Sequence, residues 1–266
     1  MNRLAVHQSL VHPRTPLELV DLLRDSGWDS MGVHVGAAEE TEPWWAGGAG
    51  EHLLAAMVDR LLETRVTVLD VGRVLLEADL EPDTVHRAHG RVLDFGARLG
   101  AQFVIARFPA DADPSRLSAT ERAERFARLA EQARPFRLRP LLSSVPAGRP
   151  DLIEQAVAVV APCGGGLVLD VGVRDADAEA VSAAVTDLWE HLGYVRVDAR
   201  ALEEAGESAA GQLAVLPPHV PVVIGGDDGL GLLDRNPEER LTALRVLVDR
   251  MLEHPRARAL REARTS

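Results

Sequence analysis

Eight short apolar runs recur along the 266-residue chain, and a longer amphipathic stretch follows each of them. The runs have the length of buried strands, whereas the stretches between them have the length and periodicity of helices. Strands are expected at residues 4–9, 31–35, 66–71, 102–107, 137–143, 166–171, 194–198 and 220–225. Strict alternation through eight units predicts the α/β class, as a closed (β/α)8 TIM barrel rather than an open sheet.

The intervening stretches predict eight helices, at residues 15–26, 50–64, 82–99, 119–133, 150–160, 178–192, 208–215 and 237–253. One barrel of this type needs about 250 residues, and no linker rich in Pro, Gly or Ser divides the chain. Residues 1–266 are therefore expected to form a single TIM-barrel domain, with the basic segment 254–266 as a C-terminal tail or helix.

Composition excludes several kinds of chemistry. The chain contains no lysine, so all 29 basic residues are arginine and Schiff-base catalysis is impossible. It has no GxxxxGK[ST] loop and no GxGxxG after the first expected strand, which argues against a P-loop nucleotide hydrolase and against an NAD enzyme. The one cysteine, Cys163, permits neither an intrachain disulfide nor a cysteine-based zinc cluster.

Charge and hydropathy restrict the expected partners. The formal net charge of −12 disfavours nucleic acid and anionic membranes, because both attract positive surfaces. No apolar run is long enough to span a bilayer, and residues 1–9 lack the apolar stretch of a signal peptide. We therefore expect a cytoplasmic protein with a small-molecule substrate, and a homodimer is a reasonable oligomeric state. The alanine-rich, lysine-free composition resembles that of high-GC bacterial proteins.

In such barrels the C-terminal ends of the strands carry the chemistry. The polar residues expected at those ends include His7, His34, Asp70, Arg107, Ser143 and Asp170. Imidazole exchanges protons near neutral pH, and a neighbouring carboxylate fixes its tautomer. We expect His34 to act as general acid or base with His7 nearby, Asp70 to orient it, and Asp170 to be a second acid or base.

Other polar and aromatic residues are expected to contact substrate. The Arg107 guanidinium could hold a carboxylate or phosphate in a bidentate grip, and the Ser143 hydroxyl could bind substrate hydroxyls. Trp44 and Trp45 could form a lid or a sugar-stacking surface, or simply anchor a loop. Asp227 follows the last expected strand.

Structural alternatives exist for three of the charged residues at the strand ends. Asp70 could pair with Arg73 at the rim, and Arg107 could pair with Asp111. Asp198 is expected to lie off the inward set of its strand and to cap the next loop.

Several segments resemble xylose-isomerase-like TIM barrels, a family that includes sugar-phosphate isomerases, epimerases and endonuclease-IV-type enzymes. The segment ELVDLLRDSGWDSMGVHV resembles the helix and turn that enter the family's second strand. The segments VTVLDVGRVLLEAD, LDFGARLGAQFVIA, GLVLDVGVR and YVRVDA resemble its third, fourth, sixth and seventh strand regions. The resemblance covers nearly the whole chain in order and implies the same fold.

The resemblance also implies a divalent metal, Mn, Mg, Co or Zn, held by Glu, Asp, His and Glu at the ends of four late strands. These positions fall at Ser143, Asp170, Val195 and Gly225. A fifth family position, a Glu on the second strand, falls at Gly32. Only Asp170 is retained as a ligand, so we expect a degenerate site without a cofactor, the alternative being a divalent metal held by substitute ligands.

Three functions remain open. The first is an isomerase or epimerase acting by acid/base proton transfer on a small hydroxy-carbonyl substrate. The second is a metal-free lyase, dehydratase or cyclase of secondary metabolism, because loss of the charged ligands makes the site roomier and less polar. The third is a non-catalytic binding or partner subunit.

Overall fold

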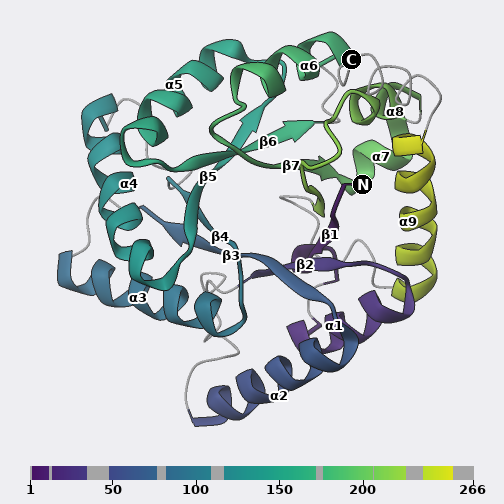
Figure 1. The fold of residues 1–266 in the computed structure, drawn as a ribbon, viewed down its shortest axis with the longest axis horizontal. Helices are drawn as coiled ribbons and strands as arrows, with labels where there is room; N and C mark the ends of the chain where they lie inside the picture. The colour runs from purple at the N-terminus through teal and green to yellow at the C-terminus, as the bar shows by residue number, and fades with distance from the viewer. Residues whose placement is uncertain are drawn as a thin grey trace.

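The computed structural model describes residues 2–11, 14–34, 48–76, 82–108, 117–171, 176–205, 207–225 and 236–253. Their strands form one closed, all-parallel barrel in chain order, with the eighth paired to the first (Figure 1). The strands are β1 (Leu4–His7), β2 (Ser30–His34), β3 (Thr67–Leu75), β4 (Phe103–Arg107), β5 (Arg139–Pro146), β6 (Gly166–Val171), β7 (Leu192–Asp198) and β8 (Val222–Gly225). The predicted eight-stranded barrel is confirmed.

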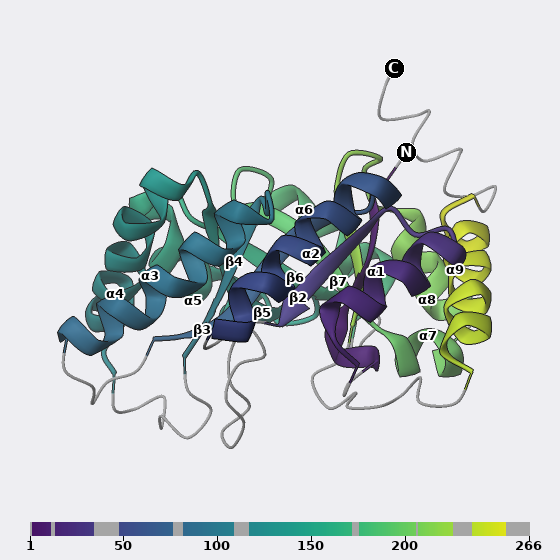
Figure 2. The same ribbon diagram turned by 90° about the horizontal axis from the view of Figure 1, so that it is seen from below.

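Helices surround the barrel, and α4 and α9 lie at opposite edges of it (Figures 1 and 2). The helices are α1 (Pro16–Asp25), α2 (Gly48–Thr64), α3 (Pro82–Arg98), α4 (Ala119–Ala133), α5 (Pro150–Val160), α6 (Ala178–Asp187), α7 (Ala199–Ala205), α8 (Glu207–Ala214) and α9 (Pro237–Glu253). Local sequence fixes two of their starts, because Thr15 with Glu18 and Ser118 with Glu121 form capping boxes.

Two differences from the sequence-based expectation surround β7. The helix predicted to reach residue 192 ends at Asp187, because β7 already begins at Leu192. After β7 the chain forms two helices instead of one. The Asp198 carboxylate accepts hydrogen bonds from the backbone N–H groups of Arg200 and Ala201, at 2.8 and 3.0 Å. This cap starts α7 immediately at the strand end.

The hydrophobic core has two parts. The larger part lies between the strands and the helices. The smaller part fills the barrel interior and takes one side chain from each of seven strands: Ala5, Leu69, Ile105, Leu141, Val168, Tyr194 and Val223. We call this second set the inner cluster. It closes the barrel below the C-terminal ends of the strands, so a ligand inside the barrel must bind above it.

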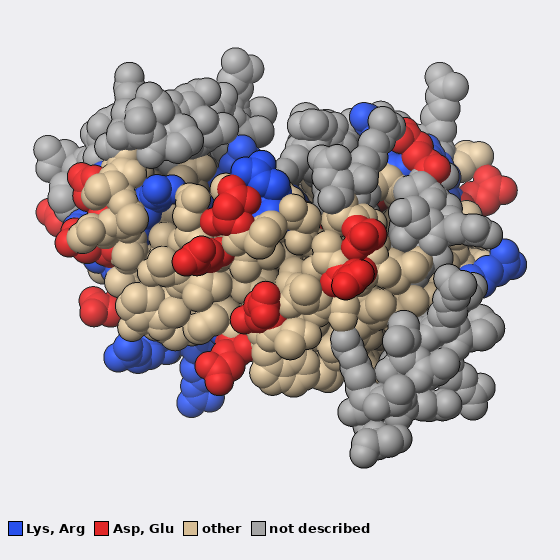
Figure 3. Space-filling model, turned by 90° about the horizontal axis from the view of Figure 1, so that it is seen from above, with Lys and Arg blue, Asp and Glu red and all other residues tan. Residues whose placement is uncertain are grey.

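Charged side chains on the face shown in Figure 3 are interspersed, with acidic groups and arginines scattered over a mostly uncharged surface. None of the helices within the described ranges is both long and apolar enough to cross a membrane.

Candidate functional site

A polar layer lies directly above the inner cluster, at the C-terminal ends of the strands. Successive side chains of a strand point to opposite faces, so the residue two places beyond each inner-cluster member again points inward. For β1, β4, β5, β6, β7 and β8 these residues are His7, Arg107, Ser143, Asp170, Arg196 and Gly225. Four of the six predicted strand-end residues, His7, Arg107, Ser143 and Asp170, thus share one layer, and Asp70 joins it by a different route.

Asp70 reaches the barrel interior through an irregularity in the pairing of β2 with β3. Met31 pairs with Val68, but the next residue, Gly32, pairs with Asp70, so Leu69 is an extra residue in β3. Such a bulge changes the direction of the side chains that follow it. Leu69 packs in the inner cluster, and the Asp70 carboxylate lies over Gly32.

The Asp70 carboxyl is fully buried, and burial raises its pKa from 3.8 to about 7. The Tyr194 phenol and the positive charge of Arg196 lower this pKa, but they do not offset the desolvation. Neither carboxylate oxygen has a hydrogen-bond partner of normal geometry in the described residues, so the interaction with Tyr194 falls short of a full hydrogen bond. The carboxyl therefore titrates near neutral pH.

Tyr194 is the only tyrosine of the chain and is 3% exposed. Burial, followed by the negative charge of Asp70, raises the pKa of its phenol well above 10. The phenol therefore stays protonated at neutral pH and acts as a hydrogen-bond donor. Tyr194 therefore lies beside the Asp70 carboxyl, just under the polar layer.

The two predicted histidines lie close together, with ring centroids 6.4 Å apart and rings nearly perpendicular. The Ser9 backbone N–H donates to Nδ1 of His7 at 3.2 Å, and the Ser9 hydroxyl lies 2.8 Å from the same atom. Because Nδ1 accepts a hydrogen bond, neutral His7 carries its proton on Nε2. The backbone of His34 is held by Gln8, whose Oε1 accepts its N–H at 3.0 Å.

Asp170 and Arg196 form a bidentate ion pair between adjacent strands. Arg196 Nε and Nη2 donate to the two carboxylate oxygens at 2.7 and 3.0 Å. The Arg196 side chain is 15% exposed and the Asp170 side chain is 16% exposed, so the ion pair is largely buried. The sequence marks Asp170 as a carboxylate that follows a buried run and needs a compensating partner. Arg196 is that partner.

The polar layer encloses a small cavity of about 20 Å³, lined by His7, Ser143, Tyr194 and Arg196 among others. We call it the mouth cavity. Its volume is sufficient for about one water molecule. The His7 imidazole, the Tyr194 phenol and the Arg196 guanidinium supply hydrogen-bond donors around it. A cavity rich in donors suits an oxygen atom that becomes negatively charged.

The described residues do not fit the divalent metal that the fold family implies. The family's seventh-strand ligand position was assigned to Val195, which was wrong: Val195 packs outward in the larger core, and Arg196 points inward. The last two positions therefore offer a guanidinium and Gly225. Both oxygens of Asp170 are engaged by that guanidinium. Among the described residues, no three His, Cys, Asp or Glu side chains lie close enough to hold a metal ion.

Other sequence predictions have mixed outcomes. The pairing of Asp70 with Arg73 at the rim is wrong, because Asp70 is fully buried and no ion pair joins the two in the described part of the chain. Arg107 and Ser143 both line a second, larger cavity. Trp44, Trp45 and Asp227 lie outside the described residues.

Sequence reasoning missed Tyr194, Arg196 and the tight approach at Gly32. Tyr194 and Arg196 share the alternate positions of YVRVDA with Asp198, and this alternation was the available signal. The inward set of this strand was predicted to contain Val195 instead. Asp198 does cap the following helix, as expected, but its predicted place off the inward set was wrong, because it shares the parity of Tyr194 and Arg196.

Gly32 is required by the close approach of His7 and Asp70. A Cβ at this position would lie 2.8 Å from Cδ2 of His7 and 2.9 Å from Oδ2 of Asp70. We expect Gly32→Ala to lower the free energy of unfolding by about 1–3 kcal/mol, as overpacking does, measured by urea denaturation. Gly211→Ala on α8 is the control, because the nearest atom to its Cβ is 4.0 Å away. Equal stability of the two variants would contradict the tight packing of these residues.

Comparison with solved structures gives the fold family. A xylose isomerase domain protein from Alicyclobacillus acidocaldarius has a TM-score of 0.68 at 20% identity, covering 97% of this chain and 100% of that one. The IolI protein, solved with a bound zinc atom, has a TM-score of 0.67 at 12% identity, covering 94% and 98%. The 3-keto-D-glucoside 4-epimerase YcjR from E. coli has a TM-score of 0.64 at 11% identity, covering 94% and 99%.

No protein-family model and no curated protein sequence matches the chain. The structural similarities, all at low identity, establish the fold. It is the xylose-isomerase-like TIM barrel that the sequence motifs predicted.

Proposed function

We propose that this chain, which has the fold of xylose-isomerase-like TIM barrels, transfers protons next to the carbonyl of a small hydroxy-carbonyl substrate. The reaction class is that of an isomerase or epimerase, working without a divalent metal. One observation carries the proposal: hydrogen-bond donors, among them His7, Tyr194 and Arg196, line the mouth cavity, and a carboxyl with a pKa of about 7 lies beside Tyr194.

Proton transfer at such a carbon produces an enolate, whose negative oxygen needs stabilisation. In the proposal the Tyr194 phenol and the Arg196 guanidinium bind this oxygen. Donors fixed before the reaction stabilise a developing charge without reorganising, which is the main way in which buried sites lower such barriers. In this role the Arg196 guanidinium supplies the positive charge that a divalent metal ion supplies in metal-dependent enzymes.

His34 and His7 are the proposed acid and base, because imidazole gains and loses protons near neutral pH. Ser9 fixes the His7 tautomer, so that Nε2–H is its donor. Asp70 acts as a positioning residue for Tyr194 and His7. Asp170 was expected to be a second acid or base, but both of its oxygens bind Arg196, so the proposal gives it the role of orienting that guanidinium.

Solvent-exchange measurements test the proposal. The purified protein is incubated in D2O with EDTA and a panel of ketohexoses, aldohexoses and their phosphate esters, and proton NMR follows each carbon next to a carbonyl. We expect deuterium to enter at one such carbon with EDTA present. His34→Ala should slow this exchange by at least about 10²-fold, as loss of a positioned acid or base does, whereas the exposed control His52→Ala should not. Exchange that requires added Mn, Co or Zn would overturn the metal-free proposal.

A second candidate is a lyase, dehydratase or cyclase acting on a larger molecule. It is favoured by a cavity of about 400 Å³ that shares Ser143 with the mouth cavity and is lined by five larger apolar side chains, Phe108, Leu142, Val145, Leu152 and Val159. Loss of water or ring closure without exchange at the starting carbon would support this second function. Ligand binding with neither reaction would support a binding subunit.

A further inference from the structure

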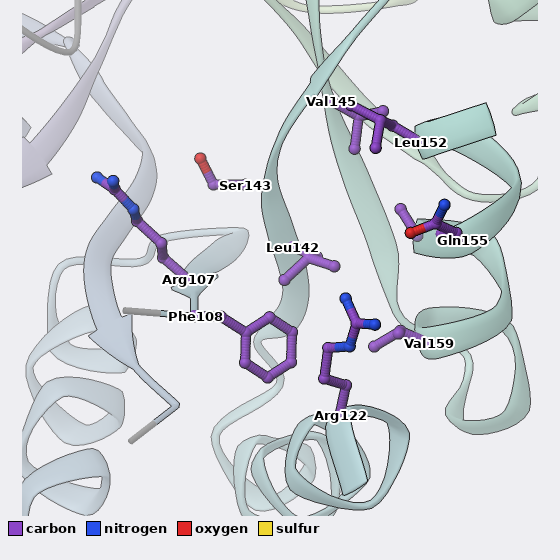
Figure 4. Close-up of a pocket in the computed structure, with 10 residues that line it drawn as sticks. Arg107, Phe108, Arg122, Leu142, Ser143, Val145, Leu152, Gln155 and Val159 are labelled. Atoms are coloured by element: carbon purple, nitrogen blue, oxygen red, sulfur yellow. The ribbon is translucent and has the colours of Figure 1, made fainter. Parts of the chain in front are cut away.

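The larger cavity lies outside the barrel interior, over β4 and β5 and against α4 and α5 (Figure 4). Its volume of about 400 Å³ falls in the range of small-molecule sites. Its apolar wall is formed mainly by the side chains of Phe108, Leu142, Val145, Leu152 and Val159. We call it the α4–α5 pocket.

Two guanidinium groups line this apolar pocket, those of Arg107 and Arg122. In the described part of the chain neither has a carboxylate partner, although arginines elsewhere on α4 do; Arg128, for example, lies 3.8 Å from Glu124. Nε of Arg122 is buried and has no hydrogen-bond acceptor among the residues that the structure describes. The Arg122 guanidinium thus lines the pocket without a compensating carboxylate among the described residues, and an anionic ligand in the pocket would balance its charge.

The pocket has two chemically different ends. Figure 4 shows Arg122 rising from α4 into the space between Phe108 and Val159, with Gln155 above it. Arg107 and Ser143 lie at the opposite end, and Arg107 extends away from Arg122. The apolar wall separates these ends. Ser143 also lines the mouth cavity, so this end of the pocket adjoins the proposed reaction site.

We propose that the α4–α5 pocket binds an organic anion with an apolar body, its carboxylate or phosphate ester group held by Arg122. The body lies along Phe108, Leu142 and Val159, and the far end of the ligand reaches Ser143. The inference rests on the proposed function only in identifying the bound anion as the distal part of a substrate. Binding itself requires no turnover.

Direct binding tests the pocket. Isothermal titration calorimetry is carried out on the full chain with octanoate, octyl phosphate and uncharged octan-1-ol. We expect at least one of the two anions to bind about 10- to 100-fold more tightly than octan-1-ol, as expected for a charge-assisted hydrogen bond. Arg122→Gln should remove this preference. Arg128→Gln, an exposed arginine of the same helix, is the control and should retain it.

Three results would overturn the proposal: no binding of either anion, equal binding of the anions and the alcohol, or equal loss of binding in Arg122→Gln and Arg128→Gln. Arg122→Met provides a second uncharged variant if Arg122→Gln does not fold. The same titration on His34→Ala separates the two proposals. Retained binding together with lost exchange supports both, whereas retained binding with normal exchange in that variant contradicts only the proposed acid/base role.

Discussion

Asp70→Asn is expected to become more stable relative to the natural protein as pH rises from about 4 to 7, by about 4 kcal/mol in total. Burial raises the pKa of this carboxyl from 3.8 to about 7. The folded state therefore holds a proton in this interval that the unfolded state has released. Stability from this group is fully present below the unfolded pKa and is lost as pH rises through the folded pKa.

The measurement is urea denaturation of both proteins at intervals between pH 4 and 8. The difference in unfolding free energy should change by about 1.4 kcal/mol per pH unit across the interval and level off above pH 7. Asparagine does not titrate, so a constant packing penalty shifts the whole curve without changing its slope. Asp187→Asn, at an exposed position on α6, controls for the loss of one carboxylate. A difference that does not vary with pH would contradict the buried, titrating carboxyl.

Arg196→Gln is expected to lower the rate of solvent exchange by about 10²- to 10³-fold, the usual effect of removing one donor that stabilises an oxyanion. It should also destabilise the fold by about 3–5 kcal/mol, because it leaves the Asp170 carboxylate buried without its partner. The two effects have different origins. The first arises at the mouth cavity and the second from the ion pair between β6 and β7.

The double variant Arg196→Gln/Asp170→Asn separates these effects. Removing both charges should restore most of the stability, since the uncompensated carboxylate is gone, yet exchange should remain slow. Denaturation and NMR exchange on the natural protein, Arg196→Gln, Asp170→Asn and the double variant make up the double-mutant cycle. Recovery of exchange in the double variant would show that Arg196 has only a structural role. If added Mn, Co or Zn restored solvent exchange in Arg196→Gln, the assignment of the Arg196 guanidinium as the cation of the site would be contradicted.

The barrel itself could be predicted from sequence because its signal is repeated eight times, and an error of a few residues at one boundary does not change the count. The strand ends were harder. His7, Asp170 and Ser143 follow regular alternation and were placed at the strand ends. Asp70 was expected at the end of its strand, but β3 continues to Leu75, and Asp70 is buried at the extra residue Leu69 in the pairing with β2. An irregularity of this kind leaves no periodic trace in the sequence.

The seventh strand shows a different limit. YVRVDA alternates clearly, but alternation alone does not say which set faces inward, since valine suits a core on either side of the sheet. Choosing Val195 hid both Tyr194 and Arg196. Only the closed barrel shows that the arginine and the tyrosine occupy the interior, where each has a carboxyl neighbour.

The seclusion of Tyr194 gives the chain an optical property of its own. All phenol absorption in this protein comes from one ring, which packs in the inner cluster directly below the polar layer. Spectral changes of that ring therefore report on the barrel interior alone, without a label and without overlap from phenols on the surface.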